Sequence, residues 1–194
     1  MFTGIIEEIG EVIAIEREKS NVHFTVKAKI SPYLKVDQSL AHNGCCLTVV
    51  EQSDQKYKVT AIQETLDKTN LEDWVIGTRI NLERCMKADG RFDGHIVQGH
   101  VDCVATCIEI IDLNGSWKYT FRYKAGHQTV EKGSITINGT SLTVVDSLDN
   151  VFSVCIIPFT YEHTNFNEFQ LGTKVNIEFD VFGKYIQEYL KRIG

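Results

Sequence analysis

Apolar and polar residues alternate along several short stretches of the chain, which is typical of β-strands with one buried face. Residues 23–29 alternate cleanly, and residues 5–15, 57–62 and 78–84 combine β-branched side chains with flanking turn signals. Another strand is predicted directly after Gly44. With about six short strands in each half, the pattern favours a small closed barrel, because closure leaves no exposed sheet edge.

The whole pattern occurs twice, at a constant offset of 95 residues. Residues 39–51 return as residues 134–146, and both copies contain Asn-Gly, two intervening residues and then Leu-Thr-Val-Val. One register held over the whole chain indicates duplication of a complete domain. We therefore predict an all-β protein with two similar six-stranded antiparallel Greek-key barrels in tandem, in residues 1–88 and 96–181.

The last residues of the chain break the repeat. Ile186, Tyr189, Leu190 and Ile193 recur at the spacing of one helical face, which predicts a helix over residues 183–194. A single helix of this length is marginal in water, so its apolar stripe must pack on something. Packing on its own barrel and self-association with the same helix of other subunits are equally compatible with the pattern.

The composition changes this picture little. The chain has 194 residues, 43% of them hydrophobic and 24% charged, and a net charge of −6, which disfavours nucleic acid as a partner. No stretch approaches the roughly 18 apolar residues of a membrane helix, and the N-terminus does not resemble a signal peptide. We expect a cytoplasmic protein with six reduced cysteines. The spacing of cysteine and histidine fits no metal site, so we expect no metal.

The repeated motif places short polar side chains on one face of a strand. Alternate residues of a strand point to the same side, so Cys46 shares a face with Thr48, and Ser141 shares the equivalent face with Thr143. Small polar residues lining a strand are the simpler interpretation of either copy alone. Their recurrence after Asn-Gly in both halves favours a binding surface that occurs once per repeat.

Several motifs, taken in order along the chain, resemble riboflavin synthase. They are residues 1–8, 42–49, 64–66 and 69–71, and Gly94-His95 together with Gly99-His100-Val101. The resemblance covers essentially the whole chain. It implies a transferase that needs no cofactor, in which two molecules of 6,7-dimethyl-8-ribityllumazine exchange a four-carbon unit. The products would be riboflavin and 5-amino-6-(D-ribitylamino)uracil. It also implies a homotrimer held by the C-terminal helix and a site between neighbouring subunits, and it raises lumazine synthase as a further partner.

The resemblance gives expected roles to four residues. His100 is expected to take the proton lost from the 7-methyl group of one lumazine. Cys46 is expected to add to or polarise the ring of the other, if its thiolate is accessible. Ser141 and Thr143 are expected to place a water or relay a proton. Since Ser141 is equivalent to Cys46 and Ile5 to His100, we expect the N-terminal barrel to bring the thiol and the C-terminal barrel the imidazole.

Each barrel is expected to hold one lumazine, and positioning two molecules in contact contributes on the order of 7–11 kcal/mol to catalysis. Gly4 and Gly99 would allow close approach of the backbone to a planar ligand. The expected substrate-binding residues are Gly4, Ile5, Ile6, Cys46, Leu47, Thr48, Thr60, Ala61, Ile62, Gln63, Glu64, Thr65, Gly99, His100, Val101, Lys132, Ser141, Leu142, Thr143, Ile156, Ile157, Pro158, Phe159, Thr160 and Tyr161.

Lys132 of this list and four residues outside it have expectations of their own. Phe2 would either wall the ring or pack in the core, and these alternatives are equal. Lys132 would reach a ligand held by a neighbouring subunit, and Asp180 would orient water or the imidazole. We expect no catalytic role for His42 or His95.

Two other functions fit parts of the sequence. Lumazine-binding proteins without turnover resemble the same family, but their second pocket has degenerated, whereas residues 138–143 are intact here. A flavin-binding barrel of the reductase type would need a nicotinamide domain, for which the chain has no room. Riboflavin synthase activity is therefore the function we expect.

Overall fold

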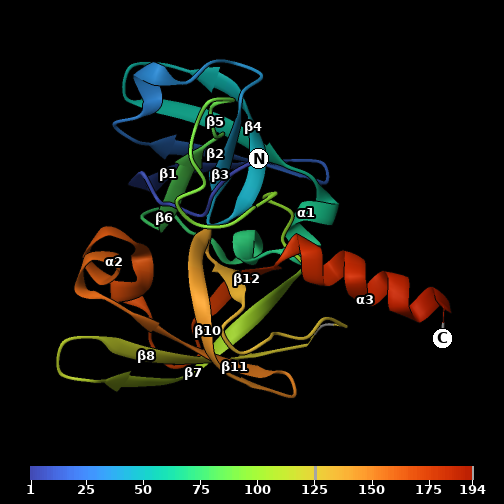
Figure 1. The fold of residues 1–194 in the computed structure, drawn as a ribbon. Coiled ribbons are helices and arrows are strands. Elements are labelled where there is room, and N and C mark those ends of the chain that lie inside the picture. Colours follow the sequence, from blue (N-terminus) through green and yellow to red (C-terminus); the bar gives the residue numbers. More distant parts are fainter. Residues whose placement is uncertain (125, 194) are drawn as a thin grey trace.

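The computed structural model describes residues 1–124 and 126–193. Each half of the chain forms a closed six-stranded antiparallel barrel, and the barrels lie one above the other in Figure 1. This confirms the predicted fold class. The first barrel contains β1 (Glu8–Glu18), β2 (Asn21–Lys27), β3 (Ser39–His42), β4 (Cys45–Gln52), β5 (Lys56–Ala61) and β6 (Arg79–Arg84). The second contains β7 (Cys103–Asp112), β8 (Trp117–Tyr123), β9 (Ser134–Ile137), β10 (Thr140–Leu148), β11 (Val151–Ile156) and β12 (Lys174–Phe179).

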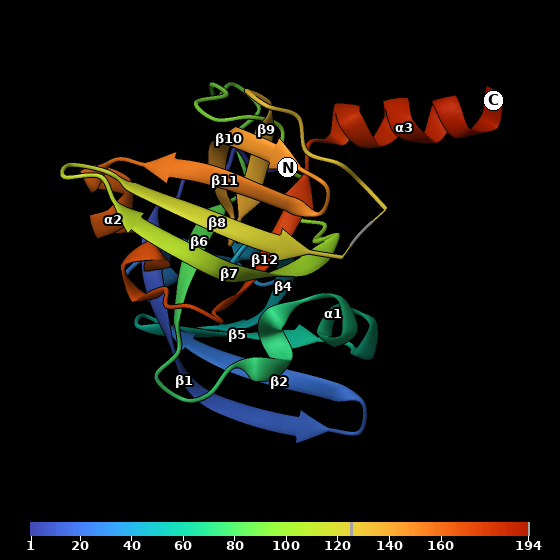
Figure 2. The ribbon, with the colours of Figure 1, turned by 90° about the horizontal axis from the view of Figure 1, so that it is seen from below.

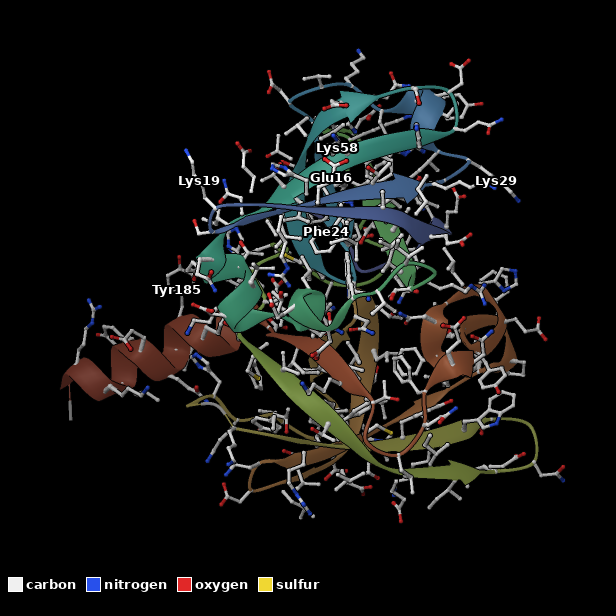
Figure 3. The ribbon with its side chains drawn as sticks, turned by 180° about the vertical axis from the view of Figure 1, so that it is seen from behind. Glu16, Lys19, Phe24, Lys29, Lys58 and Tyr185 are labelled. Atoms are coloured by element: carbon white, nitrogen blue, oxygen red, sulfur yellow. The ribbon has the colours of Figure 1, made fainter. Side chains whose placement is uncertain are left out.

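Both barrels have the same Greek-key order of strands. The first runs β1-β2-β5-β4-β3-β6 and closes through pairing of β1 with β6. The second has the equivalent neighbours, β10-β11-β8-β7-β12-β9. Inward-facing residues fill each barrel with its own core, for example Phe24, which lies inside the first barrel (Figure 3), and Phe121 in the second.

Several short elements were not predicted. The strand β3 precedes Asn43-Gly44, which forms the tight turn into β4. The helices α1 (Gln63–Lys68) and α2 (Pro158–His163) follow the fifth strand of each barrel, and each leads into a 3₁₀ turn, Asn70–Asp73 or Asn165–Glu168. A third 3₁₀ turn spans Ser31–Tyr33. The helices and 3₁₀ turns are too short to show a helical period in the sequence, and β3 is too short to show a strand alternation.

The two barrels pack through six buried asparagines, three at equivalent positions of each repeat. The Nδ2 of Asn81 donates to the carbonyl of Asn138 at 2.9 Å, and the Nδ2 of Asn176 donates to the carbonyl of Asn43 at 3.0 Å. These contacts are reciprocal, so a local two-fold axis relates the barrels. The other pair, Asn70 and Asn165, donates backbone N–H groups to Asn176 and Asn81. The hydrogen bonds that these buried asparagines make across the boundary fix the relative position of the barrels, although the Oδ1 of Asn70 has no partner among the described residues.

The first residues of each repeat lie against the barrel of the other repeat. Phe2 forms an isolated antiparallel bridge with Val97, where the two starting segments cross. The N–H of Cys46 then donates to the carbonyl of Gly99 at 2.9 Å, and the N–H of Ser141 to the carbonyl of Gly4 at 2.8 Å. We call residues 2–6 and 97–101 the crossing segments.

The helix α3 (Val181–Ile193) projects away from both barrels in two perpendicular views (Figures 1 and 2). Asp180 accepts the N–H of Phe182 at 3.0 Å, so the helix begins two residues earlier than predicted. Its apolar residues Tyr185, Ile186, Tyr189, Leu190 and Ile193 are all more than half exposed. The alternative in which this stripe packs on its own barrel is therefore wrong. No helix among the described residues is long and apolar enough to cross a membrane.

Candidate functional site

The outer faces of β4 and β10 carry the predicted polar groups. Cys46 is half-buried and Thr48 exposed on β4, while the residues between them point into the core. Ser141 and Thr143 have the same arrangement on β10. The predicted alternation of faces is confirmed, and each polar face looks outward from its barrel.

The crossing segments determine which groups meet at each face. Because Gly99 is hydrogen-bonded to Cys46, the neighbouring His100 lies at the N-terminal barrel, where Val101 also packs against the core. The prediction that thiol and imidazole belong to different barrels is therefore wrong. The offset identified His100 as part of the second repeat, but the chain carries it across to the first barrel.

The structure gives a second reason for the two predicted glycines. A Cβ added at Gly4 would lie 2.6 Å from the Cβ of Ser141, and one added at Gly99 would lie 2.6 Å from the Cβ of Cys46. Both glycines have positive φ, of 78° and 81°. The opposite barrel's strand therefore by itself requires glycine at both positions, and approach of the backbone to a planar ligand stays a prediction.

Two buried carboxylates that we had not singled out hold the crossing segments. Glu83 on β6 accepts the N–H groups of Thr3 and Gly4 at 2.7 and 3.0 Å. Glu178 on β12 accepts those of Gln98, Gly99 and His100 at 2.7–2.9 Å. Burial raises the pKa of both acids, that of Glu178 to about 7, while the N–H donors oppose the shift. The repeat could have identified them, because Glu83 and Glu178 are the same residue type at equivalent positions of the two repeats.

His95, to which we had given no role, contacts the second polar face. Its Nδ1 lies 2.7 Å from the hydroxyl oxygen of Ser141, and its Nε2 lies 3.1 Å from that of Thr136. Burial lowers the pKa of His95, against a smaller opposite effect of Asp180, so the neutral imidazole is favoured near pH 7. The repeat offered no signal, because the equivalent position would precede Met1.

The thiols near the first face are not activated in the isolated chain. Burial raises the pKa of Cys46, and it raises the pKa of the inward-facing Cys45 to about 12. The condition set for Cys46, an accessible thiolate, is therefore not met in this state. Cys46 presents an S–H group to its surroundings at neutral pH.

The structure separates the other predicted binding residues into inward and outward groups. Leu47, Ala61 and Ile156 point into the barrel cores, so they can offer a ligand only backbone groups. Leu142 and Tyr161 are half-buried against the second core, and the Tyr161 ring stacks on Trp117 at 3.9 Å. The residues with exposed or half-buried positions outside the cores are Ile5, Ile6, Thr60, Ile62, Gln63, Glu64, Thr65, Ile157, Pro158, Phe159 and Thr160.

Three residues considered separately have clear positions. Phe2 is fully buried against Ala41 and Val97, so core packing accounts for it. Asp180 caps α3 through its contact with Phe182. Lys132 is exposed in a turn with φ of 64°, which matches the turn at the equivalent Asp37.

Neither polar face is enclosed within the single chain. Cavities of 160–430 Å³ occur on other surfaces, and the residues lining them include none of the four predicted catalytic residues. Within residues 1–124 and 126–193, no group of three His, Cys, Asp or Glu side chains is placed to hold a metal ion.

Both halves of the chain match a known protein domain. The lumazine binding domain model matches residues 3–85 and again residues 98–180. The chain is 42% identical to a riboflavin synthase of Actinobacillus pleuropneumoniae, with 98% of this chain and 90% of the relative covered. It is 38% identical to that of Bacillus subtilis, with 99% and 91% covered.

Solved structures agree on the fold. LumP in complex with 6,7-dimethyl-8-(1'-D-ribityl) lumazine superposes with a TM-score of 0.84, covering 92% of this chain and 98% of that one, at 22% identity. At this identity the likeness concerns the fold alone. The sequence relatives and the duplicated domain carry the assignment: the chain belongs to the riboflavin synthase family, with one lumazine binding domain in each barrel.

Proposed function

We propose that the two outward polar faces are two substrate pockets, and that the reacting pair forms where the pocket of one subunit meets the other kind of pocket on a neighbour. Membership of the riboflavin synthase family gives the reaction. Two molecules of 6,7-dimethyl-8-ribityllumazine exchange four carbons, giving riboflavin and 5-amino-6-(D-ribitylamino)uracil. Because donor and acceptor are the same compound, two related pockets suit the pair, and no cofactor is needed.

One observation supports this proposal most strongly. The polar faces are equivalent by the local two-fold axis, and each is completed by a crossing segment from the other repeat. Each pocket therefore combines a small polar pair from a strand with backbone groups of an irregular segment. The polar pair suits a ribityl chain, and the free backbone groups suit the edge of a bicyclic ring.

The residues at the first face act on one lumazine. His100 takes the proton from the 7-methyl group. Since burial raises the pKa of Cys46, its S–H donates a hydrogen bond to polarise the ring, in preference to attack by a thiolate. At the second face, the Nδ1 of His95 hydrogen-bonds to the Ser141 hydroxyl at 2.7 Å and holds it in position to orient water.

Assembly completes the site in this proposal. Each polar face is open in one chain, and Ile62 and Ile157 are exposed beside the two faces at equivalent positions. The apolar stripe of α3 is also uncovered, which supports self-association through this helix, and the homotrimer is the assembly that the family resemblance implies. Lys132 reaches the ligand of a neighbour in such an assembly. Association with lumazine synthase and a cytoplasmic location stay predictions from the sequence.

Incubation of the purified protein with the lumazine alone tests the proposal. We expect riboflavin and the pyrimidine product in equal amounts, with no added cofactor. The competing function is a lumazine-binding protein without turnover, and tight binding with no riboflavin would select it. Alanine at Cys46 or His100 should slow turnover far more than it weakens binding.

A further inference from the structure

We propose that Glu178 is a positioning residue, which holds the His100 imidazole at the Cys46 pocket by fixing the crossing segment between the two barrels. The inference rests on the proposed function for the role of His100. It concerns a residue that does not touch the substrate. Its geometric part can be tested without any turnover.

The first step is the set of hydrogen bonds to the Glu178 carboxylate. One oxygen accepts the N–H of Gln98 at 2.7 Å, and the other accepts those of Gly99 and His100, both at 2.9 Å. Three consecutive peptides are thus fixed by one side chain that is only 2% exposed.

The second step is the opposite side of the same segment. The carbonyl of Gly99 accepts the N–H of Cys46 at 2.9 Å, and Gly99 has no room for a side chain there. The peptide before His100 is therefore held from both sides, by β12 of its own repeat and by β4 of the other. A shift of the Glu178 contact would move His100 relative to Cys46.

The third step is a fixed point just after His100. Asp102 accepts the N–H of Phe179 at 2.8 Å, and Lys184 at the base of α3 lies 3.0 Å from both Asp102 oxygens. This ion pair is mostly buried. The positive charge of Lys184 favours the ionised form of Glu178, which burial opposes. Both ends of the His100 segment are thus tied to β12 and α3.

The first repeat contains the same arrangement without the helix. Glu83 holds Thr3 and Gly4, and Glu7 accepts the N–H of Arg84 at 2.7 Å while pairing with its guanidinium at 2.6 Å. The segment fixed there carries Ile5, which has no titratable group. Glu83 is therefore a control with the same carboxylate and similar burial at the equivalent position, although it also accepts the Thr3 hydroxyl, and it acts on the opposite pocket.

The kinetic test compares Glu178→Gln and Glu83→Gln, each alone and with His100→Ala. We expect Glu178→Gln to lower kcat roughly 10- to 100-fold with little change in KM, and to lower kcat no further once His100 is alanine. Glu83→Gln should lower kcat by the same factor in the His100→Ala background as it does in the wild-type background. Equal losses by Glu178→Gln in both backgrounds would overturn the inference.

A second measurement separates this inference from the reaction itself. In protein labelled with ¹⁵N-histidine, the His100 resonances should shift in Glu178→Gln and stay in place in Glu83→Gln. Unmoved His100 resonances in Glu178→Gln would overturn the inference even if riboflavin is formed. Shifted resonances in Glu178→Gln, combined with a wild-type protein that forms no riboflavin, would support the geometry and refute the proposed function.

Folding is the remaining concern for a buried substitution. The Asp102 side chain is 18% exposed and so is less buried than that of Glu178, and Asp102→Asn retains its size while loosening the same segment by weakening the pair with Lys184. We expect the same pattern with a smaller loss of kcat. A purified, folded Asp102→Asn protein with unchanged kcat and unmoved His100 resonances would contradict the positioning role.

Discussion

Gly44 and Gly139 touch each other across the boundary between the two barrels. A Cβ on Gly44 would lie 2.7 Å from the backbone nitrogen of Gly139, and a Cβ on Gly139 would lie 2.8 Å from that of Gly44. Both residues have positive φ, of 78° and 80°. The two copies of the Asn-Gly turn thus contact each other at the local two-fold axis.

This contact predicts a large effect of one methyl group. Gly139→Ala should lower the free energy of unfolding by about 3 kcal/mol, because the backbone is strained and the barrels are pushed apart. Gly172→Ala is the matched control, since its φ of 91° is equally unfavourable but nothing lies within 4 Å of the added carbon. It should cost about 1 kcal/mol. Equal losses in denaturant titrations would show that the contact contributes nothing.

The asparagine network predicts a second effect on stability. Asn81→Ala removes the side chain that donates to Asn138 and Asn165 and accepts from the N–H of Asn165. Buried partners lose their hydrogen bonds, so we expect a loss of about 2–4 kcal/mol in the free energy of unfolding. Alanine at the exposed Asn167 should change it by less than about 0.5 kcal/mol. A loss below 1 kcal/mol for Asn81→Ala would argue against the network.

His42 predicts a dependence of stability on pH. Its imidazole is buried, which lowers its pKa to about 4, and its Nε2 lies 2.9 Å from the hydroxyl oxygen of Tyr57. The unfolded chain then binds more protons between pH 6.5 and 4, and stability falls with falling pH, by roughly 3 kcal/mol in total.

The measurement is the difference in unfolding free energy between wild type and His42→Gln from pH 7 to 4. The difference is needed because Glu178, whose pKa is raised to about 7, works in the opposite direction: its stabilisation is lost as the pH rises from 4.5 towards 7. We expect the advantage of wild type over His42→Gln to shrink as the pH falls. A difference independent of pH would mean that His42 is not kept neutral by the fold.

The helix α3 predicts a change of assembly. Replacing Ile186 and Leu190 by glutamine removes part of the exposed apolar stripe, so the oligomer should dissociate and riboflavin formation should fall at least tenfold. Lys191→Gln with Arg192→Gln is the control on the polar side of the helix. Sedimentation at several concentrations measures the mass. An unchanged oligomer in the first variant would remove α3 from the subunit interface.

The sequence predicted the barrels because strand alternation and turn residues are local signals, and the offset of 95 residues showed that they occur twice. It also placed Cys46 with Thr48, and Ser141 with Thr143, on one face of a strand, since a strand fixes alternate faces, but only the structure shows that this face points outward. Short elements such as β3 and α1 escaped, because four to six residues show no distinct period.

The crossing of the segments could not be predicted. It depends on single contacts between distant residues, such as the N–H of Cys46 with the carbonyl of Gly99, and the offset between repeats does not say on which barrel a residue lies. His100 was therefore assigned to the wrong barrel. His95 was missed because it lies between the two predicted domains, residues 1–88 and 96–181, in a segment that has no equivalent in the first repeat.

The central claim is that a site combines the Cys46 pocket of one subunit with the Ser141 pocket of another. Mixing two variants tests it directly, Cys46→Ala and Ser141→Ala, dissociated together and reassembled, with mixed oligomers verified by native mass spectrometry. Each variant alone should be nearly inactive, and the mixture should regain riboflavin formation, because some contacts then pair an intact Cys46 face with an intact Ser141 face. Verified mixed oligomers without recovered activity would contradict the account.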